Sequence, residues 1–226
     1  MTRKVFIGVG HGGKDPGAVA NGFREKDLNL SVAKAVHAEL CRHGVETKMS
    51  RTDDAGDSLD DRVKTCNAYL GSDGLAVDIH HNAGGGDGAE AYYHYKGGTS
   101  KTCAENILAE IAKIGQNSRG AKIKKGSDGR DYYGFIRETR PPAVIVECAF
   151  LDNETDVQIV DSEEKRTTMG KAVAKGILKT LGVEFQEETP PKNNGEKETL
   201  SAWKEAVRTR LAELLSEIPD RLLADL

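Results

Sequence analysis

The chain has 226 residues, of which 30% are charged and 38% are hydrophobic, and its formal net charge is -4. This length suits one ordinary domain with a short additional segment, and the composition is typical of soluble globular proteins rather than of disordered or membrane-inserted ones. An acidic balance with no long Lys/Arg run excludes an electrostatic footprint for nucleic acid or for an anionic membrane.

The apolar run within residues 1–10 is too short for the core of a signal peptide and predicts a buried strand instead. No export signal is visible, so we expect synthesis in the cytoplasm without a signal peptide. The four cysteines form no Cys-x-x-Cys pair, which favours free thiols over disulfides or a structural zinc knuckle.

Short apolar runs then alternate with segments of helical period, which is typical of an α/β domain with a mostly parallel sheet. The strands that we predict span residues 4–9, 46–50, 75–80, 89–94 and 143–147. Helices are predicted from residue 28 to a stop at Gly44, over 58–70, over 100–114, and from a cap formed by Asp161 and Glu164 to a stop at Gly182.

The compact domain should therefore occupy residues 1–183. Residues 184–199 are polar, contain Pro190-Pro191 and Asn193-Asn194-Gly195, and predict an exposed linker. Residues 200–226 carry an apolar stripe at helical spacing, which a lone helix of this length cannot bury by itself. We expect this C-terminal helical segment either to pack back on the main domain or, as the favoured alternative, to mediate self-association.

The loop after the first strand, Gly8-Val-Gly-His-Gly-Gly13-Lys14-Asp15, formally matches the G-x-G-x-x-G dinucleotide pattern and nearly matches a P-loop. In the dinucleotide fingerprint a helix begins at the glycines, whereas Pro16 and Gly17 prolong this loop. Asp15 stands where a P-loop needs a hydroxyl, and its carboxylate would repel phosphate. A nucleotide binder is thus a weak alternative, and it leaves His11 without a role.

Three further features of the sequence suit metal or proton chemistry. The strand at 75–80 continues into His80 and His81, of which alternation lets one face a site together with Asp78 and Asn82. The buried strand at 143–147 ends in Glu147, and burying an unpaired carboxylate is expensive unless it faces a cation or titrates. Glu25 stands just before the first predicted helix, where a solvated glutamate is equally typical.

These blocks, in order, are Gly10-His-Gly-Gly13, Glu25, Asp78-Ile-His-His-Asn-Ala83 and Val144-Ile-Val-Glu-Cys-Ala-Phe-Leu-Asp-Asn153. Together they resemble the zinc-dependent N-acetylmuramoyl-L-alanine amidases of the amidase 3 family over roughly residues 4–182. The resemblance implies a twisted six-stranded sheet flanked by helices, one zinc ion bound by His11, Glu25 and His80, and a catalytic Glu147.

Asp78 and His81 depart from the pattern of that family, which has a small or apolar residue at the first position and a small residue at the second. We expect Asp78 to bond a neighbouring strand or a metal ligand, and His81 to be a wall or core residue. Asn82 and Arg137, the latter in Tyr132-Tyr-Gly-Phe-Ile-Arg137, are weaker candidates for contact with substrate or with Glu147. For Arg137, a surface salt bridge is an equal alternative.

Two histidines and one carboxylate leave zinc one open position, which is the catalytic pattern. Zinc lowers the pKa of water from about 15.7 to about 7, and Glu147 would carry the proton to the leaving amine. The implied substrate is the bond between N-acetylmuramic acid and L-alanine in peptidoglycan, and a phage endolysin that reaches the wall after release is the predicted role. Alternatives are a sporulation or mother-cell autolysin, a zinc peptidase that cuts the stem peptide, and a non-catalytic wall-binding module. For residues 200–226, binding to the wall is the alternative to self-association.

Overall fold

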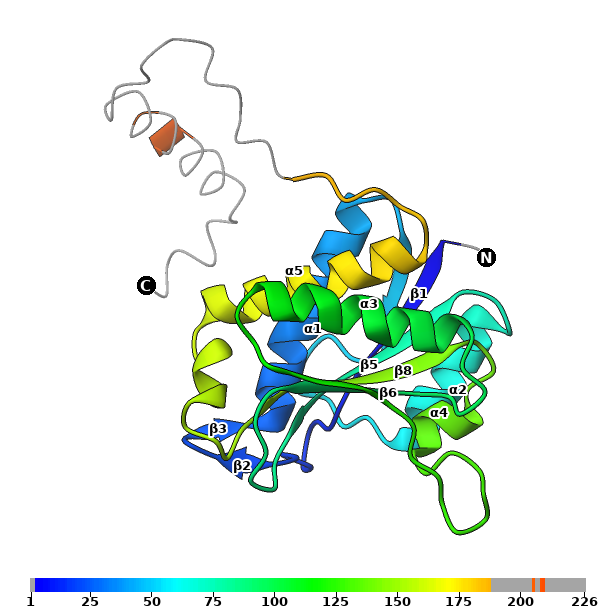
Figure 1. Ribbon diagram of the computed structural model, residues 1–226. Helices are drawn as coiled ribbons and strands as arrows, with labels where there is room; N and C mark the ends of the chain where they lie inside the picture. Colours follow the sequence, from blue (N-terminus) through cyan, green and yellow to red (C-terminus); the bar gives the residue numbers. More distant parts are fainter. Residues whose placement is uncertain (1–2, 188–204, 206–207, 210–226) are drawn as a thin grey trace, which may run out of the picture. The chain divides into compact units, whose positions relative to one another are not determined.

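The computed structural model describes residues 3–187 together with residues 205, 208 and 209 (Figure 1). Most of the predicted linker at 184–199, and nearly all of the predicted helical segment at 200–226, lie outside the described residues. Self-association through that segment stays a prediction. The first compact unit of the chain is Met1–Gln186.

A six-stranded sheet with the strand order β4-β1-β5-β8-β6-β7 forms the centre of this unit. Its strands are β1 (Lys4–Val9), β4 (Glu46–Met49), β5 (Leu75–Asn82), β6 (Ala89–Tyr93), β7 (Ser118–Lys122) and β8 (Ala143–Phe150). All neighbouring strands are parallel except β6 and β8, which are antiparallel. The expected α/β fold with a mostly parallel six-stranded sheet is therefore confirmed.

Two strands at the centre of the sheet are longer than the sequence predicts. The prediction that β8 ends at Glu147 was wrong, because the next three residues are buried and continue the strand to Phe150. Likewise β5 runs beyond His80 to Asn82, with an irregularity in its pairing to β8 between these two residues. As a result, His80 and Glu147 lie opposite each other on adjacent strands, inside the sheet rather than at its edge.

The edge strand β7 was missed, and so was the small hairpin of β2 (Val19–Ala20) and β3 (Phe23–Arg24). The β7 sequence Ser-Arg-Gly-Ala-Lys carries none of the β-branched or aromatic residues that mark a strand. Its pairing with β6, and not its own propensity, makes it a strand.

Helices cover both faces of the sheet (Figure 1). A large apolar core holds residues of α1 (Glu25–Arg42), α3 (Thr99–Lys113) and α5 (Glu163–Thr180) against one face. A smaller core lies on the other face with α2 (Leu59–Leu70) and α4 (Gly134–Glu138), and the short helix η1 (Asp156–Ile159) follows β8. None of the helices that the structure describes is long and apolar enough to cross a membrane.

The helix ends follow local chemistry. Gly44 and Gly182 follow α1 and α5 with φ of 70° and 66°, so the predicted glycine stops are confirmed. The predicted cap at Asp161 was wrong by one residue, because the Ser162 hydroxyl accepts the Lys165 N–H at 3.2 Å. Glu25 is the first residue of α1 rather than a residue before it.

Strand alternation decides which side chains reach each core. Phe6, Ala76 and Ile145 belong to the smaller core, on the side of α2 and α4. Residues two or four positions further along the same strands share this face, because strand side chains repeat every second residue. They include Asp78, His80 and Glu147, so the smaller core gives way to polar groups toward the carboxyl ends of β5 and β8.

Candidate metal centre and active site

Three side chains from separate parts of the chain converge beyond the end of β1. His11, Glu25 and His80 each offer a ligand atom, and these atoms all lie within 4.8 Å of one another. The two oxygens of Glu25 divide between the imidazoles: Oε2 lies 3.1 Å from His11 Nε2, and Oε1 lies 3.0 Å from His80 Nδ1. The two rings are nearly perpendicular, with centroids 5.2 Å apart.

Each of these side chains is placed by its own element. His11 follows β1 with φ of 62°, a left-handed conformation that is uncommon for residues other than glycine. Glu25 begins α1, where its N–H donates to the carbonyl of Ala18 at 2.8 Å. His80 projects from β5 toward both, so a strained loop, a helix end and a strand supply one group each.

Gly10 lets the His80 ring lie directly against the backbone of the first loop. A Cβ atom at residue 10 would stand 2.3 Å from Cε1 of the His80 ring, far closer than packing permits. The loop is held at this distance by the Gly10 N–H bond to the Ile79 carbonyl at 3.0 Å and by Arg51, whose guanidinium donates to the Gly10 carbonyl at 3.1 Å. This geometry requires glycine at position 10.

The two contacts of Glu25 match the spacing of ligand atoms around a zinc ion. Ligand atoms at zinc distances occupy tetrahedral corners about 3.3 Å apart, close to the two contacts that Glu25 makes. The ring nitrogens that face away from the cluster have carboxylate partners: His11 Nδ1 lies 2.7 Å from Asp15, and His80 Nε2 lies 3.2 Å from Asp78. Carboxylate partners on the outer nitrogens are typical of histidines that bind metals. The residues present therefore fit a metal ion.

Electrostatics favour positive charge at this cluster. Burial alone would raise the pKa of Glu25, but hydrogen bonds with both histidines hold that pKa far below its usual range. Burial would lower the pKa of His80, yet Asp78 and Glu25 raise it to about 10. Hydrogen bonding to Glu25 likewise raises the pKa of His11. The carboxylates around the two imidazoles thus favour positive charge here, as a site built for a cation should.

Glu147 lies between two other polar residues of the sheet, opposite His80 on β5 and opposite Glu90 on β6. Its Oε2 atom is buried and has no hydrogen-bond partner among the residues that the structure describes. Burial raises the pKa of Glu147 to about 7, with Glu25 and Glu90 adding to the effect and His80 opposing it. A carboxylate with such a pKa can both accept and return a proton near neutral pH.

A cavity of about 270 Å³ opens beside the cluster, on the face of α2 and α4. It is lined by His11 and His80 on one side and by Leu59, Tyr133 and Phe135 on the other. The cluster therefore has a mixed apolar and polar space in front of it, as a substrate site requires.

The two weaker candidates lie elsewhere. The Asn82 amide donates to Glu90 at 3.0 Å. The guanidinium of Arg137 donates to the carbonyls of Asp131 and Tyr132 and pairs with Glu138 at 2.6 Å.

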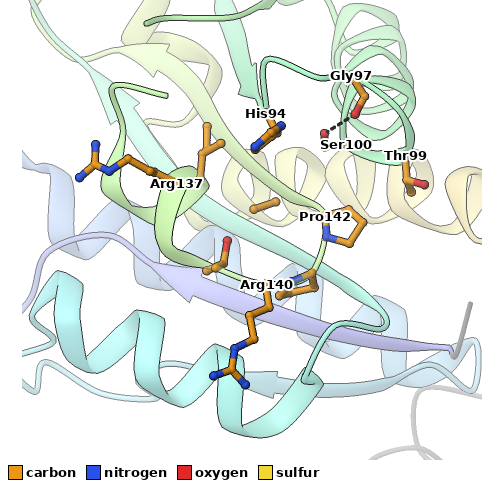
Figure 2. A pocket seen from close by; sticks show the side chains of 11 residues that line it. His94, Gly97, Thr99, Ser100, Arg137, Arg140 and Pro142 are labelled. Atoms are coloured by element: carbon orange, nitrogen blue, oxygen red, sulfur yellow. Dashed lines mark hydrogen bonds between the residues drawn. The ribbon is translucent and has the colours of Figure 1, made fainter. Parts of the chain in front are cut away.

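Arg137 also lines a second pocket, with His94, Arg140 and Pro142 (Figure 2). That pocket adjoins the first residue of β8, whereas Glu147 lies further along the strand. Contact of Asn82 or Arg137 with substrate stays a prediction.

Sequence reasoning missed three groups that surround the site. Asp15 entered only as an argument against phosphate, and Arg62 and Glu90 did not enter at all. Arg62 pairs with Asp78 at 3.0 Å, and Glu90 pairs with Arg119 and Lys122. An acidic residue within a predicted strand was the one signal available for Glu90.

Comparison with known proteins agrees with this geometry. The model of the N-acetylmuramoyl-L-alanine amidase family matches residues 5–179. The endolysin of Bacillus phage SPP1 is 33% identical, over 81% of this chain and 68% of its own length. The sporulation-specific N-acetylmuramoyl-L-alanine amidase of Bacillus subtilis (strain 168) is 34% identical, over 77% of this chain and 66% of its own length.

A solved structure supports the same assignment. The crystal structure of N-acetylmuramoyl-L-alanine amidase from Clostridium difficile 630 superposes with a TM-score of 0.72 at 30% identity, over 80% of this chain and 97% of that one. The matched region contains His11, Glu25, His80 and Glu147. The chain belongs to the N-acetylmuramoyl-L-alanine amidase family.

Proposed function

We propose that this chain hydrolyses the amide bond between N-acetylmuramic acid and L-alanine in bacterial peptidoglycan, using one zinc ion held by His11, Glu25 and His80. The observation that carries the proposal is the convergence of these three ligand groups beside Glu147, in a member of the amidase family. The donor set supports zinc, because two imidazoles and one carboxylate are a usual catalytic zinc set.

Bound zinc would supply Lewis-acid polarisation of the scissile carbonyl and would make water a better nucleophile. The chain's own residues then have separate tasks. Glu25 and the two histidines would hold the ion, and Asp15 and Asp78 lie against the outer ring nitrogens of His11 and His80. The apolar wall, which includes Tyr133 and Phe135, limits the access of bulk water.

Glu147 is proposed as the group that moves the proton. As the attacking water oxygen bonds to the carbonyl carbon, Glu147 takes its proton. As the carbon–nitrogen bond breaks, Glu147 delivers that proton to the departing nitrogen of L-alanine. The second proton of the water also passes to this nitrogen, so the products are the lactyl carboxylate of the sugar and a peptide with an ammonium terminus, and atoms and charge balance. The unpartnered Oε2 and the pKa of about 7 suit this exchange.

The relatives named above include both a phage endolysin and a sporulation-specific amidase at nearly equal identity. We retain the endolysin role, and with it action on the wall after release, as the proposed biological setting. Lysis of cells from within upon expression together with a membrane-pore protein, and no lysis without that protein, would support this setting.

Digestion of purified cell wall by the zinc-loaded protein, with mass analysis of the fragments, tests the chemistry. We expect new amino groups on L-alanine and intact stem peptides. Cuts within the stem peptide would instead identify a zinc peptidase, and binding to wall without any new amino group would identify a binding module. Glu147→Gln provides the matched control, because it should bind zinc and wall without releasing peptide.

A further inference from the structure

Asp78 is a buried carboxylate that the proposed reaction does not use directly. Its exposed fraction is 1%, and it stands two residues before His80 on the same face of β5. Its Oδ2 atom lies 3.0 Å from Nη1 of Arg62 and 3.2 Å from Nε2 of His80. The carboxylate thus joins a buried arginine of α2 to a proposed metal ligand.

The burial of Asp78 at this position lowers the stability of the fold. Asp78 Oδ1 is buried and has no hydrogen-bond partner among the described residues, and an unsatisfied buried oxygen destabilises a protein. Gly8, its partner on β1, leaves the needed room, because a Cβ atom there would stand 2.2 Å from Oδ1. The pairing with Arg62 alone does not explain this arrangement, since Asp57 already pairs with the same arginine at 2.8 Å.

The orientation of the His80 ring indicates what the Asp78 carboxylate does. A neutral imidazole carries one N–H, and only its other nitrogen can bind a metal. In His80 it is Nδ1 that faces Glu25, at 3.0 Å, so Nδ1 is the nitrogen placed to bind the ion. With the ion bound there, the single N–H of the neutral ring would be on Nε2, where Asp78 can accept it. Without this acceptor the ring could turn over or exchange its tautomer.

We propose that Asp78 is a positioning residue for the metal centre: it accepts the Nε2–H of His80 and so presents Nδ1 to the ion, while Arg62 holds the carboxylate in place. This inference rests on the proposed function, because it assumes that His80 binds zinc. It assigns opposite nitrogens to the two histidines, since His11 faces Glu25 through Nε2 and Asp15 through Nδ1.

Asp78→Asn tests the proposal, with Asp57→Asn as the matched control. Both variants remove one carboxylate from Arg62, but only Asp78 contacts His80. Zinc affinity is measured for the full chain by competition with a chromophoric chelator. Loss of a partner of a metal-bound histidine weakens affinity about 10–100-fold. We expect such a loss for Asp78→Asn, and a change below about threefold for Asp57→Asn.

A second readout needs no variant. In zinc-loaded wild-type protein, ¹⁵N NMR of the histidine rings should show the His80 proton on Nε2 and the metal on Nδ1. Metal on Nε2 of His80, or equal losses of affinity in both variants, would overturn the inference. A wild-type chain that binds zinc and cleaves wall, with Asp78→Asn unchanged, would refute the inference alone. A wild-type chain that binds no zinc would refute the proposed function with it.

Discussion

Two neighbouring histidines lie on opposite faces of β5, and their pKa values shift in opposite directions. On the face of α2 and α4, His80 meets the carboxylates of Asp78 and Glu25, and its pKa rises to about 10. On the face of α1, His81 is 2% exposed, bonds the Asn29 side chain at 2.7 Å, and burial lowers its pKa to about 4. His81 was expected to be a wall or core residue, and its burial makes it a core residue. Burial lowers the pKa of both histidines, and only at His80 do carboxylate partners outweigh it, so these partners decide which histidine can carry charge.

Replacement of each histidine in turn tests this difference between the two faces, and we expect the larger effect at His80. We expect His80→Ala to lose zinc and to lower amidase activity by about 10⁴-fold, because metal polarisation contributes several kcal/mol. Metal content and release of amino groups from purified wall measure the effect. Activity within tenfold of wild type would show that the face of α2 and α4 is not the reactive one.

Glu147→Gln tests the proton chemistry on the face of α2 and α4 alone. The amide keeps the size of the side chain but cannot accept the proton, so we expect turnover to fall by about 10²–10³-fold with zinc affinity retained. Steady-state kinetics on soluble wall fragments, alongside metal titration, separate the two effects. Zinc loss in parallel with activity would assign Glu147 to the ligand set instead.

His81→Leu probes the other face. The leucine leaves the Asn29 amide oxygen without the bond that His81 provides, and we expect the free energy of unfolding to fall by about 2 kcal/mol. Zinc should still bind. Urea denaturation gives the stability, and metal titration provides the contrast with His80→Ala. Loss of zinc with unchanged stability would reverse the roles that we give to the two faces.

The smallest effect that we predict is a pH dependence due to Glu147 in the metal-free protein. Burial raises its pKa from 4.5 to about 7, so between these values the folded state binds more protons than the unfolded state. The contribution of Glu147 to stability therefore falls as pH rises through this window.

Glu147→Gln removes that dependence. Its stability relative to wild type should increase by about 1 kcal/mol between about pH 5 and about pH 7, less than the full shift because the residue is partly exposed. Urea denaturation of both proteins without metal tests this, and a constant difference across the window would contradict it.

Much of the fold was predictable because the central strands are continuous apolar runs and α1 carries a strong helical period. The sequence could not predict β7, whose residues become a strand only through pairing with β6. It also could not predict that β6 runs antiparallel to β8, since the direction of a strand depends on its connections rather than on its composition.

For the site, the sequence predicted the central residues but not the contacts around them. The resemblance named His11, Glu25, His80 and Glu147, and the structure brings the first three together, with Glu147 opposite His80. Alternation along β5 separated His80 from His81. The outer contacts depend on packing between α2 and β5, so no pattern within one segment revealed that Arg62 and Asp78 meet.

The close approach of Gly10 to His80 has a consequence for engineering this enzyme. A library that varies the loop after β1 to alter specificity has no freedom at position 10, where even a methyl group would displace the imidazole. Leu59 and Tyr132, which are 44% and 54% exposed, are large side chains open to solvent at this end of the fold. Substitutions that alter specificity are therefore better introduced on the α2 and α4 side, with the loop after β1 left unchanged.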